Sequence, residues 1–196
     1  MKRTEKKRKD IIDAAIDEFR EQGFLGARTT SIAKKANVSS RTLYNHFENK
    51  EALFEAISEI MIERNWCMEP VPYDPNDDFA KQLKDALWRY VEVIAEETAI
   101  GLSRMVMSEL IRDLSRSRQF FTETETNDYP MTRLISEAMD AGVIRKADPV
   151  FATNQLLALI KNFYFWPEFF LRENPTPKDA MDDCVEMFLA HYKADA

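Results

Sequence analysis

The hydrophobic and polar positions of this chain follow the period of an α-helix almost throughout. Between about residues 5 and 22, apolar side chains recur every three or four positions, which is the spacing of an amphipathic helix with one buried face. β-branched residues are not concentrated in alternating runs, the usual sign of strands, and the chain holds only four glycines. The pattern therefore predicts an all-α protein of about nine helices.

Two short helices are predicted to follow the first one, at about residues 29–35 and 40–47. The turn between them contains Asn37, which tolerates a positive φ, and Val38, which fills the angle between the helices. Ser39 comes directly before the second of the pair, where its hydroxyl oxygen can accept a hydrogen bond from a free backbone N–H. Two short helices joined by so tight a turn form a helix-turn-helix.

The outer face of the second short helix is polar and almost free of carboxylates, whereas Leu43 and Phe47 point inward. In the major groove of DNA, an arginine can bind guanine and an asparagine can bind adenine, and Arg41 and Asn45 lie on this face. The alternative is an ordinary surface helix of a bundle, which would carry more Glu and Asp. The outward positions are Ser40, Arg41, Thr42, Tyr44, Asn45 and His46.

Charge is divided unevenly along the chain, whose formal net charge is −7. Residues 1–50 contain 12 Lys and Arg against 7 Asp and Glu, a net charge of +5, and the remainder carries −12. A basic end on an acidic body is typical of a small DNA-binding domain joined to a different domain. We therefore expect residues 1–50 to be the DNA-binding domain and residues 51–196 to be a second, helical domain, with a helix at 50–66 connecting them.

Several other classes of protein are not favoured by the sequence. It has two cysteines, Cys67 and Cys184, which are far apart, and two histidines, so neither a zinc site nor another metal or cofactor is expected. No nucleophile–base pair or phosphate-binding glycine loop is present, and an enzyme is therefore not expected. No stretch resembles a signal peptide or a membrane span, and we expect a cytoplasmic protein.

Helical spacing continues beyond residue 66. A proline-rich loop at residues 70–75 separates the connecting helix from the rest, and Asp148-Pro149 and Thr176-Pro177 have the form of an N-cap followed by a first-turn proline. Further helices are expected from about residue 77, at 98–113, at 116–141 with an interruption at 127–130, at 150–166 with an aromatic extension, and from 176 to the end.

The helix-turn-helix segment and its flanks resemble a known family. The segment GFLGARTTSIAKKANVSSRTLYNHFENKEALFEAI is similar to the N-terminal domain of TetR-type transcriptional regulators. The spaced markers are Ile32-Ala33, Ala36-Asn37-Val38-Ser39, Thr42-Leu43-Tyr44, His46-Phe47 and Asn49-Lys50-Glu51. Two positions depart from the family pattern. Asn37 replaces the usual glycine, and Arg28 replaces a frequent threonine, which puts the usual cap of the helix at 29–35 in doubt.

The resemblance implies roles for individual residues. Thr29, Tyr44, His46 and Lys50 match positions that bind phosphates, Thr42 matches a position that contacts phosphate or base, and Thr30, Ser40, Arg41 and Asn45 match positions that read bases. Phosphate contacts set position and affinity, while base contacts set the choice of sequence. The full set of candidate DNA-binding residues is Arg28, Thr29, Thr30, Ser39, Ser40, Arg41, Thr42, Tyr44, Asn45, His46 and Lys50.

Basic residues are also concentrated before the first helix. Lys2, Arg3, Lys6, Lys7, Arg8 and Lys9 could form an arm lying along the DNA backbone or in the minor groove, or they could serve solubility alone. The sequence does not decide between these alternatives.

The last two helices have excess apolar surface, which suggests that a partner covers it. In the resembled family, such a pair forms a four-helix bundle with the same pair of a second subunit, so the resemblance implies a homodimer. A closed monomeric core is the alternative. A dimer would place two DNA-binding domains on half-sites about 34 Å apart or somewhat more.

The resemblance also implies a pocket for a small-molecule effector in the second domain. Each candidate fits a packed core as well as a ligand site. The candidate lining residues are Trp88, Met105, Met107, Asn154, Phe163, Tyr164 and Trp166, with Gln155 or Asn162 as further polar anchors.

The leading hypothesis is a ligand-responsive transcriptional regulator, a repressor that binds a palindromic operator in double-stranded DNA as a homodimer and is released by an effector. A competing hypothesis is a protein-interaction or ligand-sequestering module whose N-terminal domain no longer reads DNA. The polar face around Arg41 and Tyr44 argues against it. The sequence leaves open the operator, the effector and the sign of regulation.

Overall fold

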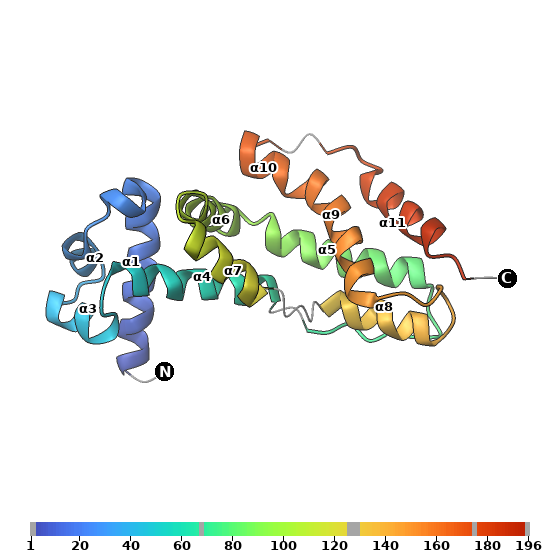
Figure 1. Cartoon of the computed structure of the whole chain (residues 1–196), viewed down its shortest axis with the longest axis horizontal. Coiled ribbons are helices and arrows are strands. Elements are labelled where there is room, and N and C mark those ends of the chain that lie inside the picture. The colour runs from blue at the N-terminus through green and yellow to red at the C-terminus, as the bar shows by residue number, and fades with distance from the viewer. Residues whose placement is uncertain (1–2, 67–68, 125–129, 174–175, 195–196) are drawn as a thin grey trace. The chain divides into compact units, whose positions relative to one another are not determined.

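The computed structural model describes residues 3–66, 69–124, 130–173 and 176–194, and these residues form helices connected by loops (Figure 1). Within these ranges there are eleven helices, and the only β pairing is an isolated bridge between Ile144 and Lys193. The all-α prediction is confirmed. The contacts between Cα atoms divide the chain into two compact units, which are described separately: residues 1–63 with 101–123, and residues 64–100 with 124–196.

The first unit has the helix-turn-helix at one end. It contains α1 (Arg3–Gly26), α2 (Thr29–Lys35), α3 (Ser40–His46), α4 (Lys50–Trp66), most of α6 (Glu97–Leu110) and α7 (Leu114–Thr124). Its hydrophobic core joins all of these helices, because the amphipathic stripe of α1 faces inward, as the sequence predicts. Among its most buried side chains are Ile11, Phe19, Ile32, Leu43, Leu53, Ile57 and Val106.

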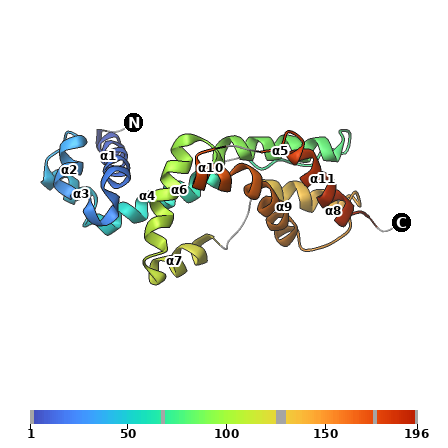
Figure 2. The same cartoon turned by 90° about the horizontal axis from the view of Figure 1, so that it is seen from above.

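The second unit contains α5 (Phe79–Ile94), α8 (Pro130–Asp140), α9 (Pro149–Tyr164), α10 (Trp166–Leu171) and α11 (Ala180–His191). α9 packs against all four of the other helices, and α11 also packs against α5 (Figure 2). Asp148 caps α9 by accepting hydrogen bonds from the backbone N–H groups of Val150 and Phe151, with Pro149 in the first turn, as predicted. Asp78 caps α5 in the same way.

Two of the predicted helices are each divided in the structure. The helix expected at 150–166 ends at Tyr164, and α10 begins at Trp166. The reason is Pro167, whose ring and missing N–H prevent α9 from continuing in one line. The helix expected at 116–141 corresponds to α7 and to α8, which begins at Pro130; the predicted interruption lies at 127–130, and residues 125–129 are outside the described ranges.

Backbone geometry explains how the N-terminal helices end. Gly23 has a φ of 67°, so α1 is regular only as far as Gln22 and turns before its last residues.

The expected division into a DNA-binding domain and a second domain at residue 50 remains a prediction. The two compact units are defined by contacts between Cα atoms, and these do not report function. In the part of the chain that is described, no helix is both long and apolar enough to cross a membrane.

Candidate nucleic-acid interface

The turn between α2 and α3 has the predicted geometry. Asn37 adopts a φ of 51°, in the left-handed region, which confirms that asparagine can take the place of glycine here. The Ser39 hydroxyl accepts a hydrogen bond from the backbone N–H of Thr42 at 3.1 Å, so Ser39 is the N-cap of α3. The backbone N–H of Val38 donates to the Ala33 carbonyl at 2.9 Å, closing the turn. These bonds fix the angle at which α3 leaves α2.

The inner side of the helix-turn-helix is anchored in the core of the first unit. Ile32 from α2 and Leu43 from α3 are fully buried, and Phe47 at the end of α3 is 5% exposed. The Arg8 guanidinium of α1 lies over the Phe47 ring, with 5.1 Å between Cζ and the ring centroid, a cation–π contact. α3 is therefore held by its apolar side, and its other side is left to solvent.

The start of α2 is joined to α3 by a hydrogen bond between side chains. Thr29 Oγ1 and Tyr44 OH are 3.0 Å apart, and the two residues are fifteen positions apart in the sequence. Tyr44 is 51% exposed although it is a large aromatic residue, so its ring is not part of the core. Two residues assigned to phosphate binding by resemblance thus have their hydroxyl groups together at the surface.

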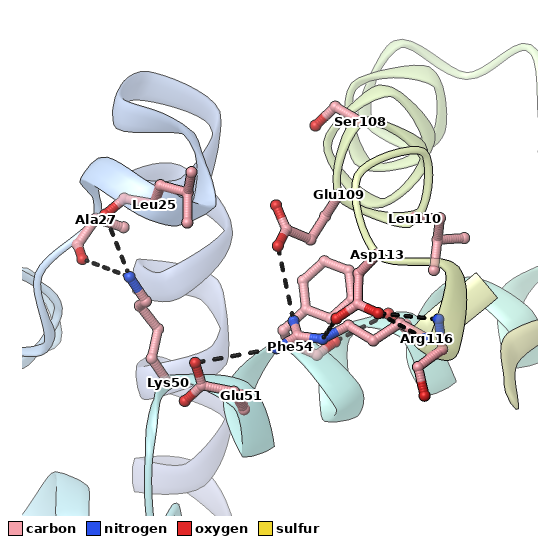
Figure 3. A network of polar contacts seen from close by, with 12 residues as sticks. Leu25, Ala27, Lys50, Glu51, Phe54, Ser108, Glu109, Leu110, Asp113 and Arg116 are labelled. Atoms are coloured by element: carbon pink, nitrogen blue, oxygen red, sulfur yellow. Dashed lines mark hydrogen bonds and ion pairs between the residues drawn. The ribbon is translucent and has the colours of Figure 1, made fainter.

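Lys50, the first residue of α4, is held against the end of α1 (Figure 3). Its ammonium group donates to the carbonyl oxygens of Leu25, at 3.4 Å, and Ala27, at 3.3 Å, and lies 4.7 Å from the centroid of the Phe24 ring. An ammonium group has three N–H donors, so one donor is left for a further acceptor. Ala27, whose carbonyl oxygen accepts one of these bonds, is two residues before Thr29 in the sequence.

The predicted base-reading residues share an open surface. Thr30, Ser40, Arg41 and Asn45 are all exposed. No hydrogen bond or ion pair within the described residues engages the Arg41 guanidinium or the Asn45 amide. Their donors and acceptors are therefore available to the edges of bases.

Two other candidates have bonds inside the motif. The hydroxyl groups of Ser39 and Thr42 are 2.8 Å apart, so both participate in the cap of α3. His46 is half-buried, and its ring lies 6.5 Å from that of Phe47, measured between centroids. A structural role for Ser39 is evident, and its assignment to DNA binding remains a prediction.

Arg28 takes the N-cap position of α2 without capping it through its side chain, as its departure from the family pattern predicts. Its backbone N–H donates to Oε1 of Glu18 at 3.4 Å, and its side chain is exposed. Glu18 also forms an ion pair with Lys35 at 3.0 Å. Burial raises the pKa of the Glu18 carboxyl group, but the bonds from Lys35, Arg28 and Ser31 outweigh it and lower the pKa below 4.5.

Glu18 is a residue of this site that the sequence pattern does not single out. It is a buried carboxylate, 5% exposed, on the otherwise apolar face of α1. Its position three residues after Ala15 and one before Phe19 marks it as inward-facing, and this was the signal available in the sequence. Through Lys35 and Arg28, Glu18 ties both ends of α2 to α1.

The basic residues before the expected first helix lie within α1, which begins at Arg3. Lys6, Arg8 and Lys9 are exposed on its first turns. Residues 3–9 therefore continue α1 and do not form a separate segment before it, because Lys, Arg and Glu have good helix propensity, and their contact with DNA remains a prediction. Lys2 lies outside the described residues.

The candidate ligand-pocket residues are dispersed. Trp88 and Tyr164 are edge to face in the second unit, with ring centroids 5.4 Å apart. Met105 and Met107 lie on α6 in the first unit, and Met105 belongs to its core. Asn154 is exposed on α9. The pocket itself remains a prediction.

The other candidates in the second unit have partners there. Phe163 is partly buried against the core, and its carbonyl oxygen accepts a hydrogen bond from the Thr176 hydroxyl at 2.6 Å. Trp166 packs in an aromatic cluster with Phe165, Phe169 and Phe170. Gln155 accepts a hydrogen bond from the Tyr192 hydroxyl.

Of the two cysteines, one lies within the described residues. Cys184 is buried and has a free thiol, and burial raises its pKa. Cys67 lies outside the described residues. Among the described residues, no three or more His, Cys, Asp and Glu side chains are grouped so as to hold a metal ion.

Comparisons with known families match both parts of the chain. Residues 11–57 match the family described as bacterial regulatory proteins, tetR family. Residues 81–194 match the family described as AefR-like transcriptional repressor, C-terminal domain. The second match alone covers more than half of the 196 residues.

Individual relatives are similar over nearly the whole length. A curated relative, the uncharacterized HTH-type transcriptional regulator YhgD of Bacillus subtilis strain 168, is 23% identical and covers 93% of this chain and 94% of its own. A TetR family transcriptional regulator from Pseudomonas syringae pv. tomato strain DC3000 has a structure with a TM-score of 0.80, 29% identity, and coverage of 97% and 98%. The flavonoid-responsive regulator FrrA gives a TM-score of 0.74, 28% identity, and coverage of 95% and 94%.

Proposed function

Because the chain belongs to the TetR family of transcriptional regulators, which bind DNA and are not enzymes, we propose that it is a ligand-responsive repressor. In this proposal, two copies of the chain bind the two halves of a palindromic operator, and a small-molecule effector releases them. Repression is supported by the description of the C-terminal family as that of a transcriptional repressor.

The observation that carries the proposal is the arrangement of polar groups on the helix-turn-helix. The paired hydroxyl groups of Thr29 and Tyr44, and the ammonium group of Lys50 at the Ala27 carbonyl, are groups suited to a phosphate backbone. Arg41 and Asn45 have exposed hydrogen-bonding groups on the outer face of α3. In this proposal, phosphate binding and base reading have separate groups of residues, which is the division expected of a sequence-specific DNA-binding protein.

Dimerisation through α9 and α11 is supported by apolar side chains left at the surface of this pair. Phe151 on α9 is 60% exposed and Met187 on α11 is 62% exposed. A shallow, mainly apolar groove between the helices includes Met187. A second copy of the pair would cover this surface and complete a four-helix bundle. The groove is lined by Gln155, Leu156, Ala158, Leu159, Met187, Phe188, His191 and Tyr192.

An effector site in the second domain is proposed from one contact between aromatic side chains and from one relative. Two of its candidates, Trp88 and Tyr164, are in contact edge to face, and Trp88 is 44% exposed and available to stack on an aromatic ligand. FrrA, described as flavonoid-responsive, is a relative whose name refers to a response to an aromatic small molecule. An effector would release DNA to the extent that it favours a conformation whose two DNA-binding domains do not fit adjacent half-sites.

A gel-shift series on the region upstream of the protein's own coding sequence tests the proposal. The expected result is a shifted band that persists against excess unrelated duplex and disappears as salt is raised. In cells, Arg41→Ala and Tyr44→Ala should abolish regulation of a reporter placed behind this region. Regulation that survives both substitutions would instead support the module that no longer reads DNA.

A further inference from the structure

Arg116 of α7 is the centre of a polar network that connects three segments of the first unit (Figure 3). Its Nη2 lies 4.0 Å from Oε1 of Glu51 on α4, and its Nη1 lies 3.9 Å from Oε1 of Glu109 on α6. Its Nε lies 3.2 Å from Oδ2 of Asp113, which also accepts hydrogen bonds from the backbone N–H groups of Ser115 and Arg116. One side chain thus joins α4, α6 and the cap of α7.

The guanidinium group also lies against two aromatic rings. Its Cζ is 4.9 Å from the ring centroid of Phe24 and 5.4 Å from that of Phe54. The Lys50 ammonium nitrogen also lies over the Phe24 ring, 4.7 Å from its centroid. Phe24 and Phe54 are themselves edge to face, with centroids 5.3 Å apart. Arg116 and Lys50 therefore share an aromatic partner that is buried in the core of the first unit.

Arg116 contacts α4 at Glu51 in its first turn and at Phe54 one turn later. The first turn also contains Lys50, which is proposed to bind phosphate and which shares the Phe24 ring with Arg116. We propose that Arg116 is a positioning residue for DNA binding, which holds this turn so that the Lys50 ammonium meets the phosphate backbone. The inference rests on the proposed function, because it assigns a role to Arg116 only if the helix-turn-helix binds DNA.

Burial explains why Arg116 can hold α4 in place. Glu109 is 6% exposed, so its carboxylate needs a nearby cation, and Arg116 supplies one. A planar guanidinium packed on rings and facing three carboxylates has little freedom to turn. Glu51, in contrast, is half exposed, so its pair with Arg116 adds little to the free energy of folding and can be removed without exposing a buried charge.

Because Glu51 can be changed without exposing a buried charge, it gives a test. A positioning role and a purely surface role for Glu51 predict opposite changes in DNA affinity. Glu51→Gln removes a negative charge close to the phosphates, and if Glu51 were only a surface carboxylate, the substitution would tighten DNA binding. If Arg116 positions the turn through Glu51, the substitution weakens binding in spite of the favourable change of charge. Glu55→Gln, one turn later on the exposed side of α4, is the matched control and should leave binding unchanged or tighten it.

The measurement is fluorescence anisotropy of the full-length protein with a labelled duplex that spans the region upstream of its gene, over a series of salt concentrations. Lys50→Gln should weaken binding about tenfold and reduce the slope of log K against log salt by about one, the loss of one phosphate contact. We expect Glu51→Gln and Arg116→Gln to weaken binding in the same direction and to flatten the slope. The double variant Arg116→Gln/Lys50→Gln should bind no more weakly than Lys50→Gln alone.

Thermal unfolding of each variant separates positioning from stability. Arg116→Gln leaves Glu109 without its cation and is expected to unfold at a lower temperature, whereas Glu51→Gln is expected to unfold close to the wild-type temperature. Wild-type protein that fails to bind the duplex would contradict the proposed function. Wild-type binding that Lys50→Gln weakens and Glu51→Gln tightens would overturn the positioning role alone.

Discussion

Thr29 Oγ1 lies 3.0 Å from Tyr44 OH and joins the first residue of α2 to the middle of α3. The sequence could assign both residues to phosphate binding only by resemblance. The structure adds that one hydroxyl group donates its hydrogen to the other, so the accepting hydroxyl keeps its own hydrogen for a further acceptor. In the proposed function, this remaining hydrogen is the one that the pair donates to a phosphate.

The first prediction concerns this pair. Tyr44→Phe removes a hydroxyl group that donates to phosphate, and we expect DNA binding to weaken about tenfold for specific and unrelated duplexes alike. The slope of log K against log salt should not change, because a neutral group releases no counterion. Thr29→Val should weaken DNA binding less than Tyr44→Phe does. The double variant should lose less binding free energy than the two single variants lose together. Anisotropy titrations measure all three, and a changed salt slope for Tyr44→Phe would contradict the assignment.

Arg41 is predicted to read a base. Arg41→Ala should reduce discrimination at one base pair of each half-site by about 1–3 kcal/mol and leave discrimination elsewhere intact. Competition with duplexes that carry single base-pair changes provides the measurement. Lys178→Ala, an exposed lysine of the second unit, is the control. A uniform loss of affinity without a change in sequence preference would assign Arg41 to the phosphates.

Ser39 is predicted to stabilise the fold through the cap of α3. Ser39→Ala removes the acceptor of the Thr42 N–H, and the free energy of unfolding should fall by about 1 kcal/mol. Ser40→Ala, at the next position, removes a hydroxyl group that caps nothing and should change the free energy by less than about 0.5 kcal/mol. Urea denaturation compares them. If both substitutions lowered the free energy of unfolding equally, the Ser39 cap would not contribute to stability.

The buried carboxylate of Glu18 predicts a dependence of stability on pH. Its pKa is lowered in the folded state, so the unfolded state binds more protons, and its stabilising contribution is present above the ordinary value of 4.5. That contribution is lost as the pH falls through the lowered pKa. Glu18→Gln should be less stable than wild type at pH 7, and the difference should shrink as the pH falls below about 4.5. Urea denaturation at a series of pH values tests this, and a difference that grows with acid would refute it.

The groove between α9 and α11 is predicted to be the dimer interface. Met187→Glu would place a charge in a buried apolar contact, so the protein should sediment as a monomer where wild type sediments as a dimer. Leu114→Glu, which changes an equally exposed apolar residue of the first unit, should leave the dimer intact. Sedimentation velocity distinguishes these outcomes. A dimeric Met187→Glu protein would place the interface elsewhere.

Much of the DNA-binding motif could be predicted from the sequence because its determinants are local. The turn at Asn37, the cap at Ser39 and the inward side of Leu43 each depend on residues within one or two turns. The contacts of Glu18 and Arg116 could not be predicted, since they depend on residues that are distant in sequence and meet only in the folded unit.

In the second unit, too, local features could be predicted from the sequence and distant contacts could not. The helix at 149–164 and its cap were clear from Asp148-Pro149, but the break before α10 depends on one proline within an otherwise apolar run. Most of the candidate pocket residues are aromatic or sulfur-containing, and a shared residue type does not determine which side chains meet. Trp88 and Tyr164 are brought together, whereas Met105 and Met107 belong to the first unit.

The central claim, that the helix-turn-helix reads DNA with separate groups for phosphates and bases, is tested most directly by one pair of titrations. Full-length wild-type protein and Arg41→Ala are titrated with the upstream duplex and with an unrelated duplex of equal length over a series of salt concentrations. We predict that wild type prefers the upstream duplex, that log K falls linearly with log salt, and that Arg41→Ala lowers the preference without changing the slope by more than about one. Equal binding of wild type to both duplexes, or binding that salt does not weaken, would contradict the claim.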